Sequence, residues 1–143
     1  MNCTLPTAGH KAQNGQSNRL MEKAKHLLTG EQGEQIAADY LIDKGYRIVA
    51  RNFRHSRGEI DLIAWWGDKL LVFVEVKTRH HELFGGPEEA VTVKKQRLLA
   101  RTAGAYMEAI GYDWAIRFDV VAVLLEHDKV KEIRHHEDAF IWM

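Results

Sequence analysis

A chain of 143 residues, of which 45% are hydrophobic and 28% charged, has the size and composition of one folded domain with a single core. Its 20 basic residues balance its 20 acidic ones, so any attraction to nucleic acid must come from a local patch. One cysteine, Cys3, excludes a disulfide framework. The longest aliphatic run, residues 120–125, is too short to span a bilayer, and no signal-peptide pattern is present. We therefore expect a cytoplasmic protein with no membrane partner.

The N-terminal residues 1–28 are predicted to form a flexible tail in which a short helix can form, ahead of a domain at 29–143. The first 19 residues are mostly polar and offer little to bury. The short helix is suggested by apolar residues at helical spacing, namely Leu20, Met21, Ala24, Leu27 and Leu28.

The domain is predicted to begin with a helix over residues 30–44. Thr29 and Gln32 form a capping-box pattern, and Gly45 is a natural end. A strand over residues 46–54 should follow, because two sets of residues alternate along it and one set is mainly basic. The apolar set is Tyr46, Ile48 and Ala50, and the other is Arg47, Val49 and Arg51.

A β-hairpin is predicted over residues 58–78, within the sequence GEIDLIAWWGDKLLVFVEVKTRH. Two apolar runs, 60–66 and 70–76, flank the turn signal Gly67-Asp68. Residues 80–89 contain two glycines and a proline, which indicates a loop.

A second helix is predicted over residues 93–110, between the N-cap Thr92 and the helix stop Gly111. Residues 116–125 are apolar enough for a central strand, and residues 130–134 fit an edge strand. The resulting order αβββαββ indicates a mixed sheet with helices packed on it, in an α/β or α+β sandwich. The inner stripe of the second helix is predicted to be Leu99, Thr102, Ala103, Tyr106 and Ile110.

Three charges interrupt the apolar strands of the hairpin: Asp61 in the first, and Glu75 and Lys77 in the second. Glu75 and Lys77 share one side of their strand, so a simple ion pair near the strand end is one interpretation. The position of Asp61 depends on the turn. A two-residue loop would place it opposite Val74, whereas a three-residue loop or a bulge would place it opposite Glu75.

With a three-residue loop or a bulge, two carboxylates meet across the strands beside one ammonium group. Mg²⁺ (or Mn²⁺) is a hard cation that takes one or two carboxylates and completes its shell with water and phosphate oxygens. Lys77 could then orient or deprotonate an attacking water and offset charge on phosphorus. Glu34 lies on the inner stripe of the first helix. A charge there has a partner or a metal-linked water, or else Glu34 is a first-turn glutamate favoured by the helix dipole.

These residues resemble a known family. The segments Gly33-Glu34, Gly58-Glu59-Ile60-Asp61-Leu62 and Val74-Glu75-Val76-Lys77 resemble the PD-(D/E)xK nuclease superfamily, with Ile60 in place of its proline. More narrowly, the blocks GEIDLIA, VFVEVKTR, FGGPEEAV and RFDVVAV, in this order, are similar to the YraN-like bacterial proteins.

The resemblance implies a restriction-endonuclease-like three-layer core, with a mixed sheet of four to five strands flanked by helices and the ExK strand central. It implies a metal site of Asp61 and Glu75, Lys77 as the catalytic lysine, and Glu34 as a helix-borne acid. That last arrangement is similar to Holliday-junction resolvases.

Outside this set, a basic rim that binds the phosphate backbone is predicted from six residues. They are Arg51, Arg54, Arg57, Arg79, Lys95 and Gln96. Glu59 is expected to pair with Arg57, and Asp119 to be a buried structural hydrogen-bond acceptor. The adjacent pairs His80-His81 and His135-His136 point opposite ways on extended chain, which disfavours a shared zinc ion.

The sequence therefore favours a Mg²⁺-dependent nuclease that acts on DNA, on branched or single-stranded forms, and that can pair as a homodimer. Two alternatives stay open. One is a nucleic-acid-binding accessory protein with the nuclease fold and little activity of its own. The other is a structural or protein-interaction domain, which would bind neither nucleic acid nor metal.

Overall fold

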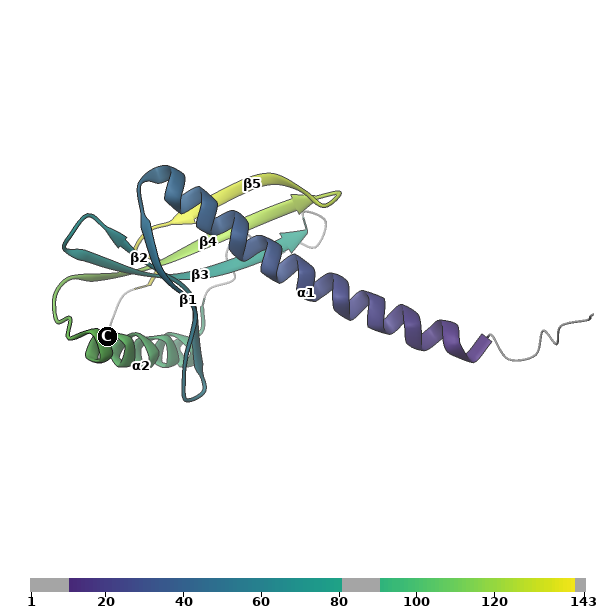
Figure 1. Ribbon diagram of the computed structural model, residues 1–143, viewed down its shortest axis with the longest axis horizontal. Coiled ribbons are helices and arrows are strands. Elements are labelled where there is room, and N and C mark those ends of the chain that lie inside the picture. The colour runs from purple at the N-terminus through teal and green to yellow at the C-terminus, as the bar shows by residue number, and fades with distance from the viewer. Residues whose placement is uncertain (1–10, 81–90, 141–143) are drawn as a thin grey trace, which may run out of the picture.

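The computed structural model describes residues 11–80 and 91–140, which form one five-stranded mixed β-sheet and two helices (Figure 1). This confirms the α/β class expected from the sequence. The elements in chain order are α1 (Lys11–Lys44), β1 (Arg47–His55), β2 (Gly58–Trp66), β3 (Leu70–His80), α2 (Val93–Ile110), β4 (Ile116–Glu126) and β5 (Lys129–His136).

The strands lie in the sheet in their chain order, β1-β2-β3-β4-β5, so that β3 is central. Three neighbouring pairs are antiparallel, and only β3 and β4 are parallel. A parallel pair needs a long crossover connection, and α2 provides it. The strand that carries Glu75 and Lys77 is therefore the middle strand, as expected.

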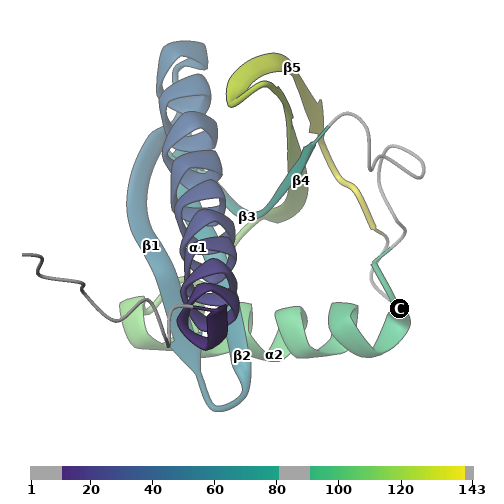
Figure 2. The same ribbon diagram turned by 90° about the vertical axis from the view of Figure 1, so that its right-hand side faces the viewer.

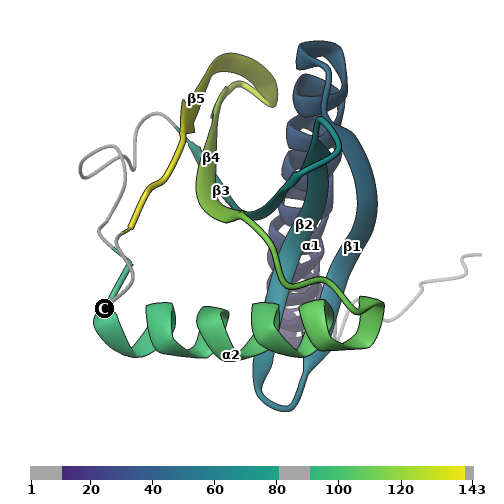
Figure 3. The same cartoon turned by 90° about the vertical axis from the view of Figure 1, so that its left-hand side faces the viewer.

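The helices cover opposite faces of the sheet and run crosswise to one another (Figures 2 and 3). Ala37, Ala38 and Leu41 of α1 pack on one face, against side chains that include Leu62 and Val74. The other face packs on α2 in a second core cluster, which consists of Ile60, Ile63, Leu71, Phe73, Leu99, Ala103, Phe118 and Phe140. Each face of the central strands thus has its own apolar core.

Helix α1 is much longer than predicted. It begins at Lys11, so Thr29 lies inside the helix and the predicted N-cap there is wrong. Figure 1 shows that the N-terminal part of α1 extends beyond the sheet, while its C-terminal part lies across the sheet. The division of the chain into a tail at 1–28 and a domain at 29–143 stays a prediction.

Helix α2 has the predicted bounds and caps. The Thr92 hydroxyl accepts the backbone N–H of Lys95, and Gly111 ends the helix in the left-handed conformation, with φ of 66°. Leu99, Thr102 and Ala103 are buried as expected. Ile110 is 45% exposed, so its assignment to the inner stripe is wrong; the helix ends there, past the edge of the core.

Strand β1 does not keep the predicted alternation. Its register with β2 shifts between Ile48 and Ala50, which indicates a bulge at Val49. Because one residue is added, Ile48 packs towards α1 and Ala50 towards α2. The single basic face predicted for this strand is therefore wrong.

Cys3 and almost all of the loop predicted over residues 80–89 lie outside the described residues, since only His80 belongs to β3. Among the described helices, none combines the length and the apolar character that crossing a membrane would require.

Candidate active site

The β2–β3 hairpin has the register that the metal-site hypothesis required. Trp66 lies opposite Leu70, so the loop contains three residues, 67–69, and the pairing continues to Leu62 opposite Val74. Asp61 and Glu75 are the next residues beyond this last pair. The predicted three-residue loop is thus confirmed, and it brings the two acids to the end of the ladder on neighbouring strands.

The backbone ladder between β2 and β3 ends at this point. Instead of a backbone bond, the Asp61 carboxylate Oδ2 accepts the Val76 N–H at 2.7 Å. The alternation of β2 also breaks at Asp61, because Ile60 packs towards α2 whereas Leu62, two residues on, packs towards α1. The Asp61 carboxylate therefore lies where β2 and β3 separate.

Asp61 is in a strongly unfavourable position for a negative charge. Burial, followed by repulsion from Glu75, raises the pKa of its carboxyl from 3.8 to about 7, against the opposing effect of the Val76 hydrogen bond. Glu34 and Glu59 add smaller contributions in the same direction. A partly buried carboxyl close to other acids is typical of functional sites, and a divalent cation would relieve its repulsion.

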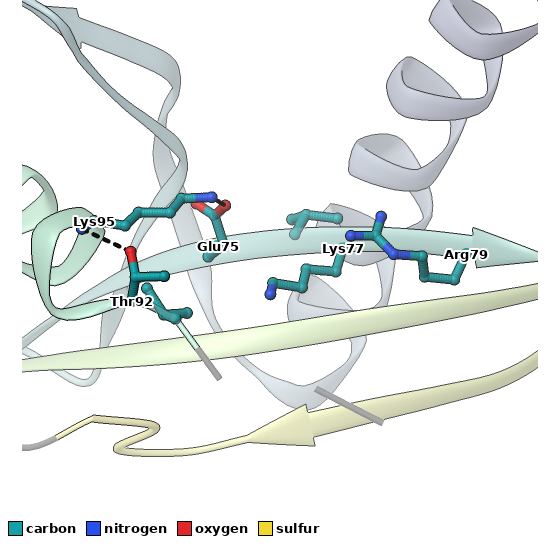
Figure 4. A pocket seen from close by; sticks show the side chains of 7 residues that line it. Glu75, Lys77, Arg79, Thr92 and Lys95 are labelled. Atoms are coloured by element: carbon teal, nitrogen blue, oxygen red, sulfur yellow. Dashed lines mark hydrogen bonds and ion pairs between the residues drawn. The ribbon is translucent and has the colours of Figure 1, made fainter. Parts of the chain in front are cut away.

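Glu75 is largely buried, and a lysine from α2 neutralises it. Lys95 Nζ lies 2.6 Å from Glu75 Oε1, and the two side chains are 48% and 12% exposed (Figure 4). They border a cavity of about 350 Å³ beside the acid pair. The cavity is lined by Glu75, Val76, Lys77, Arg79, Val91, Thr92 and Lys95.

The cavity is rich in cationic groups. Lys77 and Arg79 follow Glu75 at intervals of two along β3, and Lys95 reaches the cavity from the first turn of α2 (Figure 4). Three cations that line one cavity suit an anionic ligand that bridges them. Phosphate oxygens are such ligands.

Glu34 approaches from the other side of the sheet. Its helix packs closely on β3 at Gly33, where an added Cβ would lie 1.7 Å from Thr78 Oγ1. Glu34 is half-buried, and its charge is among those that raise the pKa of Asp61. Because Asp61 lies where two strands separate, the negative charge of an acid on the α1 side can raise the pKa of its carboxyl.

The donor set fits a magnesium-type ion better than a zinc-type ion. Within residues 11–80 and 91–140, no three His, Cys, Asp or Glu side chains are grouped closely enough to hold a metal by themselves. Asp61 and Glu75 would supply two carboxylates, with water and phosphate oxygens for the remaining positions. Mg²⁺ characteristically binds in this way.

Only some residues of the predicted basic rim lie at the cavity. Arg79 and Lys95 line the cavity, while Arg51 donates to Gln35 Oε1 at 2.8 Å on the α1 side. The Gln96 side chain donates to Val91 O at 2.8 Å and so supports the start of α2.

Two further arginines of the rim lie on and after β1. Arg57 is exposed, and Arg54 lies 3.6 Å from Glu59. The expected partner of Glu59, Arg57, was therefore wrong.

Asp119 has the structural role that the sequence suggested. Its carboxylate accepts two hydrogen bonds of 2.8 Å from Arg117, one of 2.7 Å from His135 Nε2 and one of 3.1 Å from the Asp138 N–H. Burial acts to raise its pKa, but these hydrogen bonds outweigh burial and hold the pKa below its ordinary value. The group joins β4 to the end of β5 and has no place in the acid pair.

The sequence did not indicate the contact between Lys95 and Glu75. The two residues are 20 positions apart on different elements, and no periodicity links them. The only local signal was Thr92, which fixes the start of α2 and with it the first turn that carries Lys95.

The chain is similar to bacterial proteins of one family. The profile of "Uncharacterised protein family UPF0102" matches residues 33–123. A UPF0102 protein of Rhodococcus jostii is 48% identical over 82% of this chain and 99% of its own length. One of Geotalea uraniireducens is 46% identical over 85% and 96%, and one of Symbiobacterium thermophilum is 57% identical over 66% and 80%. The matched segment contains Glu34, Asp61, Glu75 and Lys77.

Proposed function

The chain belongs to the uncharacterised protein family UPF0102, and from the geometry of its own strands we propose that it is a metal-dependent nuclease that hydrolyses phosphodiester bonds in DNA. The observation that carries the proposal is the position of Asp61 and Glu75 on neighbouring strands directly beyond the last pair of the β2–β3 ladder, close enough for Glu75 to raise the pKa of Asp61. Fold stability alone gives no reason to bring two carboxylates together there, since burial, followed by repulsion from Glu75, raises the pKa of Asp61 to about 7.

In this proposal, Asp61 and Glu75 would hold one Mg²⁺ or Mn²⁺ ion. The ion, when bound, polarises the phosphate and favours ionisation of a water molecule. The Val76 N–H fixes the Asp61 carboxylate through its 2.7 Å hydrogen bond, so the carboxylate needs little reorganisation to act as a ligand.

Lys77 is assigned to the attacking water and the developing charge. It lies two residues beyond Glu75 and lines the same cavity. An ammonium group in that place orients the water and offsets negative charge on phosphorus during displacement. Glu34 contributes from α1 as an acid whose charge acts on Asp61.

The substrate class follows from the cavity. Lys77, Arg79 and Lys95 surround it, and they lie on a chain without net charge. A local group of cations on a protein without net charge suits a polyanion that binds at this one place on the surface. DNA with an accessible backbone, in branched or single-stranded form, fits this description, and a homodimer would place two such sites on one substrate.

A cleavage panel tests the proposal. The purified protein is incubated with supercoiled plasmid, single-stranded DNA and a four-way junction, each with Mg²⁺, with Mn²⁺ and with EDTA. The proposal expects strand cleavage of at least one substrate with either metal and none with EDTA. The accessory-protein alternative instead expects binding that weakens steeply with salt, without cleavage. An absence of both cleavage and binding contradicts both functions.

A further inference from the structure

The contact between Lys95 and Glu75 occupies the carboxylate that the metal would need. Glu75 is 12% exposed, and its Oε1 is 2.6 Å from the Lys95 ammonium group (Figure 4). A carboxylate oxygen that accepts a charged hydrogen bond of this length is not fully available as a metal ligand. Lys95 and a divalent cation therefore compete for Glu75.

Lys95 is also able to move. Its side chain is 48% exposed, and its backbone N–H, bound to Thr92 Oγ1, is held by the N-cap and not by the ion pair. The side chain can therefore leave Glu75 without loss of the helix start. The cavity that it borders lies between Glu75 and Arg79, where an incoming phosphate would meet Lys77 and Arg79.

We propose that Lys95 is a positioning residue with two alternative partners: it neutralises Glu75 in the metal-free protein, and it transfers to a nucleic-acid phosphate when a metal ion binds Glu75. The inference rests on the proposed function and extends it. Metal binding then prepares the phosphate site, so metal and nucleic acid strengthen one another's binding. Such coupling is reciprocal by thermodynamic necessity.

The first experiment measures metal affinity alone. Mn²⁺ is titrated by calorimetry into the wild type, Lys95→Met, Lys94→Met and Glu75→Gln, without nucleic acid. Methionine keeps the apolar stem of lysine and removes the competing ammonium, so we expect Lys95→Met to bind Mn²⁺ about fivefold more tightly than the wild type. Lys94, the exposed neighbour in the same turn, is the matched control and should leave the affinity unchanged. Glu75→Gln should lose the site.

The second experiment measures affinity for a labelled single-stranded DNA oligonucleotide, with Ca²⁺ in place of a catalytic metal and with EDTA. We expect Ca²⁺ to strengthen binding by the wild type and by Lys94→Met. The gain should be about fivefold smaller in Lys95→Met, because that variant has no ammonium to transfer.

The outcomes separate this inference from the function on which it rests. If Mn²⁺ binds the wild type and is lost in Glu75→Gln, but Lys95→Met binds it equally or more weakly, the exchange is wrong and the nuclease proposal stands. The exchange is also wrong if Ca²⁺ strengthens DNA binding equally in both lysine variants. If the wild type binds no Mn²⁺, both fail.

Discussion

Asp61 of β2 and Val76 of β3 are joined by a 2.7 Å hydrogen bond from a backbone N–H to a carboxylate, at the position where the ladder between their strands ends. The contact takes the place of backbone pairing and holds the Asp61 carboxylate close enough to Glu75 for repulsion to raise its pKa. It places a charged group inside the layer of the sheet, which is unfavourable for stability and useful for binding a cation.

The first prediction concerns the acids and the lysine of the site. Asp61→Asn, Glu75→Gln and Lys77→Met are each expected to lower the rate of metal-dependent DNA cleavage by at least about 10²-fold, since the first two remove a metal ligand and the third removes the ammonium that acts on the attacking water. Rates are measured on the substrate that the wild type cuts, and circular dichroism checks the fold. Lys69→Met, in the hairpin loop, is the control and should keep the wild-type rate. Near-normal cleavage by all three site variants would contradict the assignment.

The second prediction concerns pH and stability. Because the pKa of Asp61 is about 7 in the folded protein and near 3.8 in the unfolded chain, the folded state holds a proton that the unfolded state has released between these values. The free energy of unfolding should therefore fall as the pH rises through this window. Asp61→Asn removes this pH dependence. The free energy of unfolding of the variant minus that of the wild type should therefore be about 3 kcal/mol greater near pH 8 than near pH 4.5.

Urea unfolding without metal at the two pH values measures that difference. Asp43→Asn, at an exposed position of α1, serves as the control and should show almost no change between them. If the free energy of unfolding differed between Asp61→Asn and the wild type by the same amount at both pH values, the fold would not disfavour the ionised form of the Asp61 carboxyl.

The third prediction concerns the approach of α1 to the sheet. A Cβ at position 33 would lie 1.7 Å from Thr78 Oγ1, so Gly33→Ala should lower the free energy of unfolding by about 2 kcal/mol. Thr78→Gly, added to Gly33→Ala, should recover part of this loss. Gly30→Ala is the matched control, because nothing lies within 4 Å of a Cβ there, and it should be neutral or slightly stabilising. Equal effects of Gly30→Ala and Gly33→Ala on stability would contradict the close packing.

The fourth prediction concerns nucleic-acid binding. Arg79→Ala should weaken binding to single-stranded DNA and reduce the slope of log affinity against log salt by about 1, because one phosphate contact is lost. Arg134→Ala is the control; that residue pairs with Glu132 on β5 and should leave the slope unchanged. Fluorescence anisotropy between about 50 and about 200 mM salt measures both. An unchanged slope in Arg79→Ala would remove this residue from the binding path.

Local patterns predicted much of this fold because they report local physics. Thr92 and Gly111 bounded α2 correctly, since capping depends on neighbouring residues alone. The local signal Gly67-Asp68 left both a two-residue and a three-residue loop open, and the requirement that Asp61 and Glu75 meet predicted an odd loop or a bulge, which the three-residue loop at 67–69 satisfies. That requirement is chemical, and it fixed a register that periodicity alone left open.

The errors arose where tertiary structure decides. Thr29 is of a residue type that favours the N-cap position, but α1 begins at Lys11 and Thr29 lies inside it. The bulge at Val49 has no marker in the sequence, because it is defined only by the pairing of β1 with β2. The pairing of Lys95 with Glu75 depends on the path of α2 across the sheet, which no residue spacing encodes.

The most direct measurement is an anomalous difference map from crystals soaked in Mn²⁺. We expect one Mn²⁺ peak within about 2.3 Å of an oxygen of Asp61 and of an oxygen of Glu75, with the Lys95 ammonium displaced from Glu75. A Mn²⁺-saturated crystal with no peak between these two carboxylates, and with Lys95 still paired to Glu75, would contradict it.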